Sequence, residues 1–429
     1  MVSKRYFLHV SGFDPYDASA QYRRFVRETG RFAATWNVTA LISPLQQNGA
    51  SESRWTVTTE AAGWQVATEF VQLDWSDIVR GELERPTFVK LCGGLAALAD
   101  LVWTGTARRY FSASWRYGMF FLVPFINVFL FAAVAILAGW HVGSTTAAAL
   151  SSTIAGVAAA VAVFAVAFWT LMRWPGERWR VGQAMADWMF ARDYMLGRRP
   201  DMDARLDAFA ARIVACARSS DAEEIIVAGH SLGATVAVNA LALAFERDPM
   251  LGRRGPTLAL LTIGATIPKI ALHPRGARLR EQVRRLAAEP SLTWTEYQAR
   301  DDFISFYKYD PVKLAPIDDL RPPEDLIIHR VQIHRMLSEA TWRRLRFHYM
   351  RLHYQFVMAN ERRTAYDYFM LMCGPSPFRR TVTVPDGPAA LYTADGSYVD
   401  GSGADGSCGD VPHVDAPSVA PAFPSAANG

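Results

Sequence analysis

The chain has 429 residues, of which 51% are hydrophobic and 12% aromatic, and its 13 tryptophans are many for a purely soluble protein. Its net formal charge is only +4, and it has no zinc-type spacing, basic-region helix or RNA-binding signature, so nucleic acid is a poor candidate partner. The four cysteines include no Cys-x-x-Cys pair, which argues against a disulfide framework and fits a reducing compartment.

The first part of the chain, residues 1–85, is predicted to begin an α/β domain. Strand patterns occupy 5–10, 37–42, 54–59 and 64–73, and a helical pattern occupies 17–36. Strand, helix, strand is the order typical of a parallel sheet. The N-terminal apolar run is too short for a secretory signal, so we expect none.

A long uncharged stretch follows a juxtamembrane segment at 86–116. Residues 117–172 contain no Asp, Glu, Lys or Arg, and 118–140 and 150–172 are each long enough to cross a hydrocarbon core of roughly 30 Å. Gly, Ser and Thr between them predict a short turn. The alternative is a pair of buried helices in a soluble core, but such helices seldom stay apolar on every face. We therefore expect a transmembrane hairpin.

Charges and tryptophans beside the hairpin predict its orientation. Basic residues lie outside it, before the first span and after the second: Arg108, Arg109, Arg116, Arg173, Arg178 and Arg180. Since positive charge stays on the cytoplasmic side, both ends are expected there, in a two-pass protein of the inner membrane. Tryptophans are expected at the membrane interfaces: Trp115, Trp140, Trp169, Trp174 and Trp179.

Residues 173–380 are predicted to complete the α/β domain. Helices are expected at 202–218 and 232–247, strands at 223–229, 257–265 and 292–299, and a helix-rich segment at 340–361. The tail at 386–429 is rich in Gly, Ser, Ala, Pro and Asp, and we expect it to be disordered.

The motif Gly-His-Ser-Leu-Gly at 229–233 is a GxSxG sequence placed between an apolar strand and an Ala-rich helix. A nucleophile elbow needs this context, because its serine takes a strained backbone and small neighbours let strand and helix pass. We predict that Ser231 is a nucleophile. An incidental serine in a glycine-rich turn is the alternative.

The sequence GHSLGA after a hydrophobic strand resembles the α/β-hydrolase fold superfamily. More narrowly, the segments HVSGFDPYDASAQYRRF, QLDWSDIVR, DDFISFYKYDPV and RLHYQFV resemble bacterial membrane-associated, lipase-like α/β hydrolases, and the likeness extends over roughly residues 5–375. The resemblance implies a mostly parallel sheet flanked by helices, with the transmembrane hairpin inserted into it.

A serine nucleophile needs a histidine base and a carboxylate, which follow the serine in the order acid and then histidine in this superfamily. The loop after the strand at 292–299 offers Asp301 and Asp302, and the resemblance favours Asp302. Asp310 is a weaker candidate. His273 precedes the acid and breaks the order, and His329 and His334 are open alternatives.

His348 and His353 are the remaining candidates for the base. Their spacing of five residues does not place them on one helical face, so both are not expected at one point. The resemblance favours His353 and leaves His348 in reserve. The backbone N–H groups of Leu232 and Phe13 are predicted to bind the oxyanion, with Gly12 allowing a close turn.

Together these features predict a membrane-anchored serine hydrolase, esterase- or lipase-like, that forms an acyl-enzyme and needs no metal or diffusible cofactor. Membrane lipids and an apolar acyl ester are the expected partners, and basic segments at 275–287 and 343–351 could face anionic lipid. The alternatives are a non-catalytic membrane scaffold with this fold, and an acyltransferase or peptidase with the same triad.

Overall fold

The computed structural model describes residues 1–219, 221–313 and 326–399. Its strands are β1 (Lys4–Val10), β2 (Thr39–Ile42), β3 (Gln46–Gln47), β4 (Glu52–Ala61), β5 (Trp64–Leu73), β6 (Glu224–His230), β7 (Thr257–Ile263), β8 (Leu292–Ala299) and β9 (Leu326–Val331). The helices before β6 are α1 (Ala18–Trp36), α2 (Ser76–Glu84), α3 (Thr87–Trp103), α4 (Thr106–Ala113), α5 (Trp115–Leu150), α6 (Thr153–Arg173), α7 (Pro175–Arg178), α8 (Val181–Met195) and α9 (Pro200–Ser219). The later ones are α10 (Leu232–Arg247), α11 (Ile267–Ala271), α12 (Ala277–Ala287), α13 (Ile333–Met336), α14 (Glu339–Leu345), α15 (Tyr349–Tyr354), η1 (Gln355–Val357), α16 (Tyr368–Cys373), α17 (Phe378–Thr383) and α18 (Pro388–Leu391).

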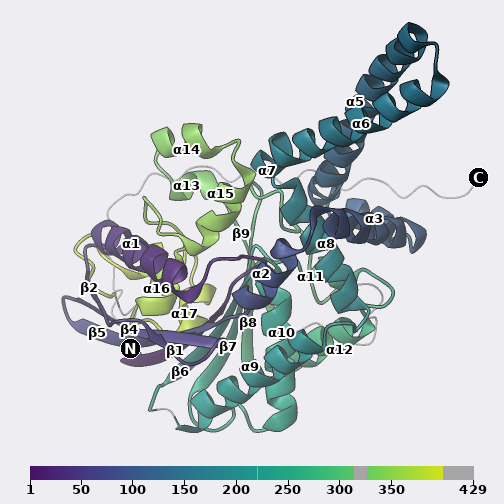
Figure 1. The fold of residues 1–429 in the computed structure, drawn as a ribbon. Helices are drawn as coiled ribbons and strands as arrows, with labels where there is room; N and C mark the ends of the chain where they lie inside the picture. Colours follow the sequence, from purple (N-terminus) through teal and green to yellow (C-terminus); the bar gives the residue numbers. More distant parts are fainter. Residues whose placement is uncertain (220, 314–325, 400–429) are drawn as a thin grey trace, which may run out of the picture. The chain divides into compact units, whose positions relative to one another are not determined.

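The strands form one mostly parallel sheet, which confirms the predicted α/β class (Figure 1). Its order is β2-β4-β5-β1-β6-β7-β8-β9, with β3 beside β4, and the pairs from β5 to β9 are all parallel. The two strands on either side of α1, β1 and β2, do not pair as the predicted strand, helix, strand unit requires. Instead β2, β4 and β5 form an antiparallel edge of the sheet. A tight turn with Gly63 at φ 82° joins β4 directly to β5 and favours this hairpin.

Side chains of each central strand alternate between two helical layers. In β6, Ile225 and Val227 face the core that contains α9, α10 and α12, whereas Ile226 and Ala228 face the core that contains α1 and α16. This two-residue alternation buries both faces of the sheet, which is why the central strands are almost continuously apolar. The loops at the carboxyl ends of these strands are thus held on a rigid support.

Helices α5 and α6 lie side by side as an antiparallel hairpin (Figure 1). They approach closely where small residues face each other: a Cβ on Gly143 would lie 2.7 Å from the Cβ of Ala160. Within the described residues, these are two helices long and apolar enough to cross a membrane. The predicted turn after residue 140 is wrong, since α5 continues to Leu150 and only Ser151 and Ser152 separate the helices.

The polar residues of that expected turn are accommodated within the helix. The hydroxyls of Ser144, Thr145 and Thr146 donate to backbone carbonyls of the preceding turn, at His141 and Val142. The turn prediction failed because Ser and Thr can satisfy their hydroxyls on their own helix and the alanines that follow favour helix.

The first half of α5 packs against the α/β domain. Phe121 lies 4.9 Å from Trp188 between ring centroids, and Tyr117 stacks on Phe306 at 3.8 Å. Exposed apolar residues dominate only from about Phe129 onward and along α6. One face of α5 is therefore buried in the domain up to about Val128, whereas Met119, Val123 and Ile126 leave apolar surface exposed on its other face.

The C-terminal region is more ordered than its composition suggests. Within the predicted disordered tail, α18 is formed, Leu391 and Tyr392 are buried, and Tyr392 pairs with Tyr398 in an isolated bridge. The prediction is wrong for residues 386–398, because two apolar side chains anchor the segment to the core that contains α1. The rest of the predicted tail, 400–429, lies outside the described residues.

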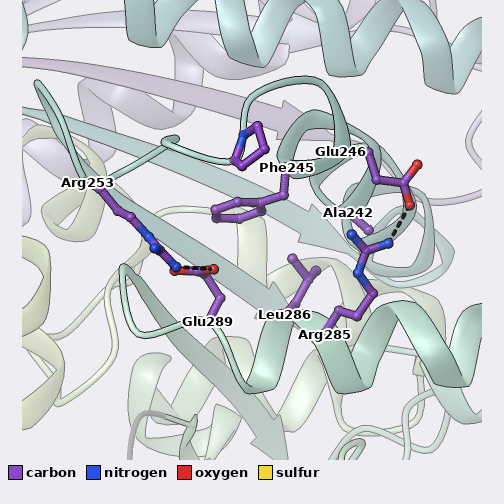
Figure 2. Close-up of a pocket in the computed structure, with 8 residues that line it drawn as sticks. Ala242, Phe245, Glu246, Arg253, Arg285, Leu286 and Glu289 are labelled. Atoms are coloured by element: carbon purple, nitrogen blue, oxygen red, sulfur yellow. Dashed lines mark hydrogen bonds and ion pairs between the residues drawn. The ribbon is translucent and has the colours of Figure 1, made fainter.

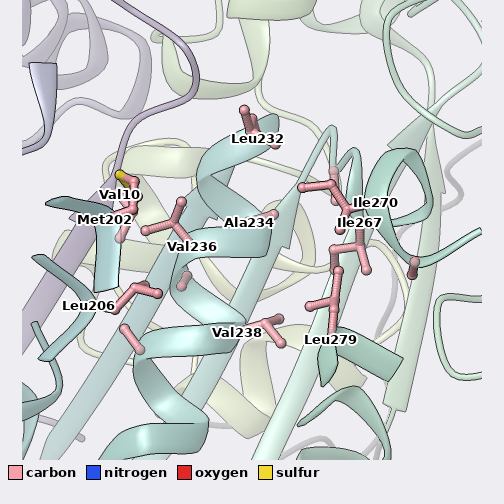
Figure 3. Packing of buried hydrophobic residues seen from close by; sticks show 14 of the residues in the cluster. Val10, Met202, Leu206, Leu232, Ala234, Val236, Val238, Ile267, Ile270 and Leu279 are labelled. Carbon is pink, nitrogen blue, oxygen red and sulfur yellow. The ribbon is translucent and has the colours of Figure 1, made fainter. Parts of the chain in front are cut away.

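Helix α10 runs through the centre of one helical layer. Near its C-terminal end, a hollow of about 410 Å³ is bordered by Phe245 and Leu286 and by two ion pairs, Arg253–Glu289 and Arg285–Glu246 (Figure 2). Along the rest of its length α10 is tightly enclosed. Figure 3 shows Val236 facing Met202 and Leu206 of α9 on one side, and Val238 facing Leu279 of α12 on the other. Leu232 at its first turn therefore has a fixed position.

Candidate active site

Ser231 stands at a sharp corner between β6 and α10. Its backbone has φ 57° and ψ −126°, a region that costs a non-glycine residue about 1–3 kcal/mol. A Cβ on Gly233 would lie 2.3 Å from the carbonyl oxygen of Val10, and one on Gly229 would lie 2.5 Å from the Cα of Ala234. Both glycines are therefore required by close backbone contacts, and the side chain of Ser231 remains partly exposed.

The loop after β1 lies against this serine. A Cβ on Gly12 would be 2.9 Å from the Cβ of Ser231, and the loop is held by a hydrogen bond of 2.8 Å from the Trp75 indole N–H to the Ser11 carbonyl. Within the described residues, neither the N–H of Leu232 nor that of Phe13 donates to another group. The two predicted oxyanion donors are therefore unpaired, and Gly12, which precedes Phe13, packs against the serine.

His353 and Asp302 form a buried pair. Nδ1 of His353 donates to Oδ2 of Asp302 at 2.8 Å, and the other carboxylate oxygen accepts the N–H of Ile304 at 2.9 Å. Asp302 is fully buried and His353 is 2% exposed. This contact selects the imidazole tautomer whose Nε2 has a free lone pair, which is the form that a general base needs.

His353 lies beside residues adjacent to the serine. Its ring centroid is 4.5 Å from that of His230, and its Cε1 would be 3.2 Å from a Cβ on Gly264. Gly264 follows Ile263, whose carbonyl accepts the N–H of Ser231 at 3.1 Å. In the described part of the chain Nε2 of His353 has no hydrogen-bond partner, so the bond to the serine hydroxyl is not formed. Such bonds are often long before substrate binds.

His230 contacts the backbone of His353, the predicted base, an interaction that sequence reasoning missed. Its Nε2 donates to the carbonyl oxygen of His353 at 3.1 Å. Burial lowers the pKa of His230 well below its ordinary value, so the ring is neutral. Its position inside the GxSxG motif was visible in the sequence, but nothing there indicated which side chain it would contact.

The reserve residues lie elsewhere. Asp301 is 3.4 Å from His334 near the surface, and His348 is exposed at the start of α15. Asp310 accepts backbone N–H groups within its own turn. His329 lies away from the site, where its Nε2 contacts the carbonyl oxygen of Val382 at 2.7 Å. The structure therefore brings Asp302 and His353 together and leaves the others apart.

The described residues contain no group of three or more His, Cys, Asp or Glu side chains able to hold a metal ion. Comparisons with protein-family models, with curated proteins and with solved structures found no match. The site is therefore interpreted from its own geometry. A positive-φ serine, unpaired N–H groups and a histidine oriented by a carboxylate are together suited to acyl transfer through a covalent intermediate.

Proposed function

We propose that the protein is a membrane-anchored serine hydrolase of α/β-hydrolase type that cleaves a carboxylic acyl ester. The observation that carries this proposal is the buried Asp302–His353 pair, which lies against the residues flanking a strained Ser231. Burying an ionisable pair is expensive, and this pair also leaves Nε2 of His353 without a partner in the described residues, as a general base requires. A structural turn would need the glycines, but it would not need this pair.

The proposed reaction begins when the oxygen of Ser231 attacks the ester carbonyl carbon. The serine proton passes to Nε2 of His353, while Asp302 holds the ring and stabilises its positive charge. The N–H groups of Leu232 and Phe13 bind the oxyanion. Collapse of this intermediate breaks the bond to the alcohol, which leaves with the histidine proton. Water then attacks the acyl-enzyme by the same steps and releases the acid.

The anchor is proposed to be the outer part of the α5–α6 hairpin. From Phe129 to Leu150 a helix extends about 33 Å, and the 21 residues of α6 extend about 32 Å, so both match a hydrocarbon core. Of the tryptophans expected at the interfaces, Trp169 and Trp174 are exposed near the end of α6, whereas Trp140 would lie near the middle of a span from Phe129 to Leu150. The flanking arginines favour placing the α/β domain on the cytoplasmic side of a bacterial inner membrane.

A fluorophosphonate probe tests the enzymatic part of the proposal. Wild-type protein in membranes should be labelled covalently, and Ser231→Ala should not be labelled. Ser291→Ala is a matched control, because that hydroxyl lies in a turn and is occupied by the Leu251 carbonyl and Glu289. Absence of labelling of the wild type would reject the hydrolase and favour a non-catalytic scaffold, whereas equal labelling of Ser231→Ala would place the reactive nucleophile at another residue.

A panel of lipid esters then separates hydrolysis from acyl transfer. We expect release of free fatty acid without added acceptor, since water is the proposed nucleophile of the second step. Product formation only with an added alcohol or amine would identify an acyltransferase instead.

A further inference from the structure

A cationic groove lies beside the candidate site. It has a volume of about 990 Å³ and is lined by α1, α14, α15 and the start of α8. Helix α1 contributes four arginines, at positions 23, 24, 27 and 31. Arg344, Arg351 and Arg180 line the rest of it. Only two carboxylates, Glu28 and Glu361, are among the described lining residues, so the groove carries a strong excess of positive charge.

Those two carboxylates are already engaged. Glu28 accepts from Arg27 at 2.8 Å and from Arg31 at 3.2 Å, and Glu361 accepts from Ser338 and Thr341. In contrast, within the described residues the guanidinium groups of Arg23, Arg344 and Arg351 make no hydrogen bond or ion pair, and all three residues are exposed. Unpaired guanidinium groups around one hollow favour an anionic ligand, and their planar forks match the oxygens of a phosphate.

The groove adjoins the candidate site through Tyr354, and neither Ser231 nor His353 is among its described lining residues. Tyr354 lines it, donates to Asp14 at 2.9 Å, and has its ring 5.6 Å from that of His230. Arg24 lies 3.7 Å from the same Asp14 carboxylate. Asp14 directly follows Phe13, the proposed oxyanion donor. An anion held in the groove would therefore be close to an ester presented to Ser231.

Arg180 is the groove residue that follows the apolar hairpin in the sequence. It is exposed and follows the end of α6 by seven residues, next to the exposed Trp174 and Trp179. A ligand that reaches the groove from this side would come from the membrane surface rather than from the solvent.

We infer that the groove binds the phosphate of an anionic glycerophospholipid, and that the ester cleaved at Ser231 is an acyl ester of the same lipid. This inference rests on the proposed function and names its substrate class. The hairpin supplies the bilayer, the arginines hold the headgroup, and the neighbouring serine attacks the acyl carbonyl.

Binding without turnover tests the inference. The full-length Ser231→Ala protein in phosphatidylcholine nanodiscs is titrated with dihexanoyl-phosphatidylglycerol. Adding Arg344→Gln and Arg351→Gln should weaken binding about tenfold or more, because two headgroup contacts are lost. Adding Arg343→Gln and Arg346→Gln is the matched control, since these arginines lie outside the groove lining on the same segment, and binding should change less than about twofold.

Equal weakening by the two pairs of substitutions, or no effect of either, would overturn the groove as the binding site. Glycerol 3-phosphate is the arm that tests the lipid source, and it should bind at least about tenfold more weakly because it lacks acyl chains. Equal affinity for it would overturn the lipid assignment. Because these titrations need no catalysis, a wild-type protein that binds the lipid but is not labelled by fluorophosphonate would reject the proposed hydrolase and leave the binding site standing.

Discussion

The two ends of α10 differ in how their polar groups are paired. At the C-terminal end, the arginines and glutamates around the hollow form ion pairs with each other and lie at the surface (Figure 2). At the N-terminal end, a strained serine, two unpaired N–H groups and a histidine nitrogen without a partner in the described residues gather beside a buried carboxylate. The closed ion pairs at the C-terminal end leave none of these described groups free to react, whereas the unpaired polar groups at the N-terminal end are held in place by buried ones and can react.

The largest expected effect is that of Asp302→Asn on ester hydrolysis. An asparagine at this position lets the imidazole adopt the wrong tautomer and removes the charge that stabilises its protonated form, so kcat should fall by about 10³-fold or more. The measurement is steady-state hydrolysis of a p-nitrophenyl ester by the full-length protein.

Asp301→Asn is the control for that experiment, because it removes the neighbouring carboxylate, which pairs with His334 away from the site. It should retain activity within about twofold. A greater loss with Asp301→Asn than with Asp302→Asn would contradict the assignment of the acid.

The stability of the fold should depend on pH through Glu296, whose carboxyl group is buried in strand β8. Burial raises its pKa to about 7, so its proton is retained in the folded state below that pH and must be lost at higher pH. The stability of the fold is therefore full below about pH 4.5, falls as the pH rises from about 4.5 to about 7, and stays lower by about 3 kcal/mol above that.

Glu296→Gln keeps one acceptor and one donor for Gln298 and Thr262 and removes this ionisation. The variant should melt at a higher temperature than the wild type at pH 8.5 and at nearly the same temperature at pH 5. Melting curves of both proteins at the two pH values check this, and a difference that does not change with pH would contradict it.

Gly12→Ala should reduce activity more than stability. The added methyl group would lie 2.9 Å from the Cβ of Ser231, which displaces the loop that carries the Phe13 N–H. A misplaced oxyanion donor should lower kcat about tenfold to a hundredfold. Gly30→Ala is the control, since a Cβ there meets no atom within 4 Å, and it should leave kcat unchanged. An unchanged kcat in Gly12→Ala would remove this loop from the mechanism.

The smallest effect is expected at the other end of α10. Arg285→Gln breaks an exposed ion pair with Glu246, and such pairs contribute about 0–1 kcal/mol. The thermal midpoint should shift by no more than about 2 °C, and hydrolysis should not change. A marked loss of activity would show that the hollow in Figure 2 has a role that its closed ion pairs do not suggest.

The sequence predicted local features of the site well and its long-range contacts poorly. Helix 232–247 and strand 292–299 have the predicted bounds, because apolar runs and the GxSxG corner act over short distances. Asp301 and Asp302 are neighbours in the sequence, and only the fold buries one of them. Likewise only the fold buries His353 and leaves His348 exposed, and only the fold brings His230 to the carbonyl of His353.

Other failures have equally physical causes. The expected turn after residue 140 is helical because Ser and Thr bond to their own helix. Residues 386–398 are anchored by the buried Leu391 and Tyr392 and by a hydrogen bond from the Trp64 indole to the Gly396 carbonyl, contacts with residues far away in the sequence. Strand β9 was missed because it is short and only partly buried. The packing of Phe121 on Trp188 joins residues far apart in the sequence, so hydropathy could not separate core from membrane surface in α5.

The most direct test of the central claim is the position and rate of phosphonylation in three proteins: wild type, His353→Gln and His348→Gln. Peptide mapping should find the adduct on Ser231 in the wild type and in His348→Gln, formed at similar rates. His353→Gln should react about 10³-fold more slowly, because no base takes the serine proton. An adduct at another residue, or a rate that is unchanged in His353→Gln, would contradict the account.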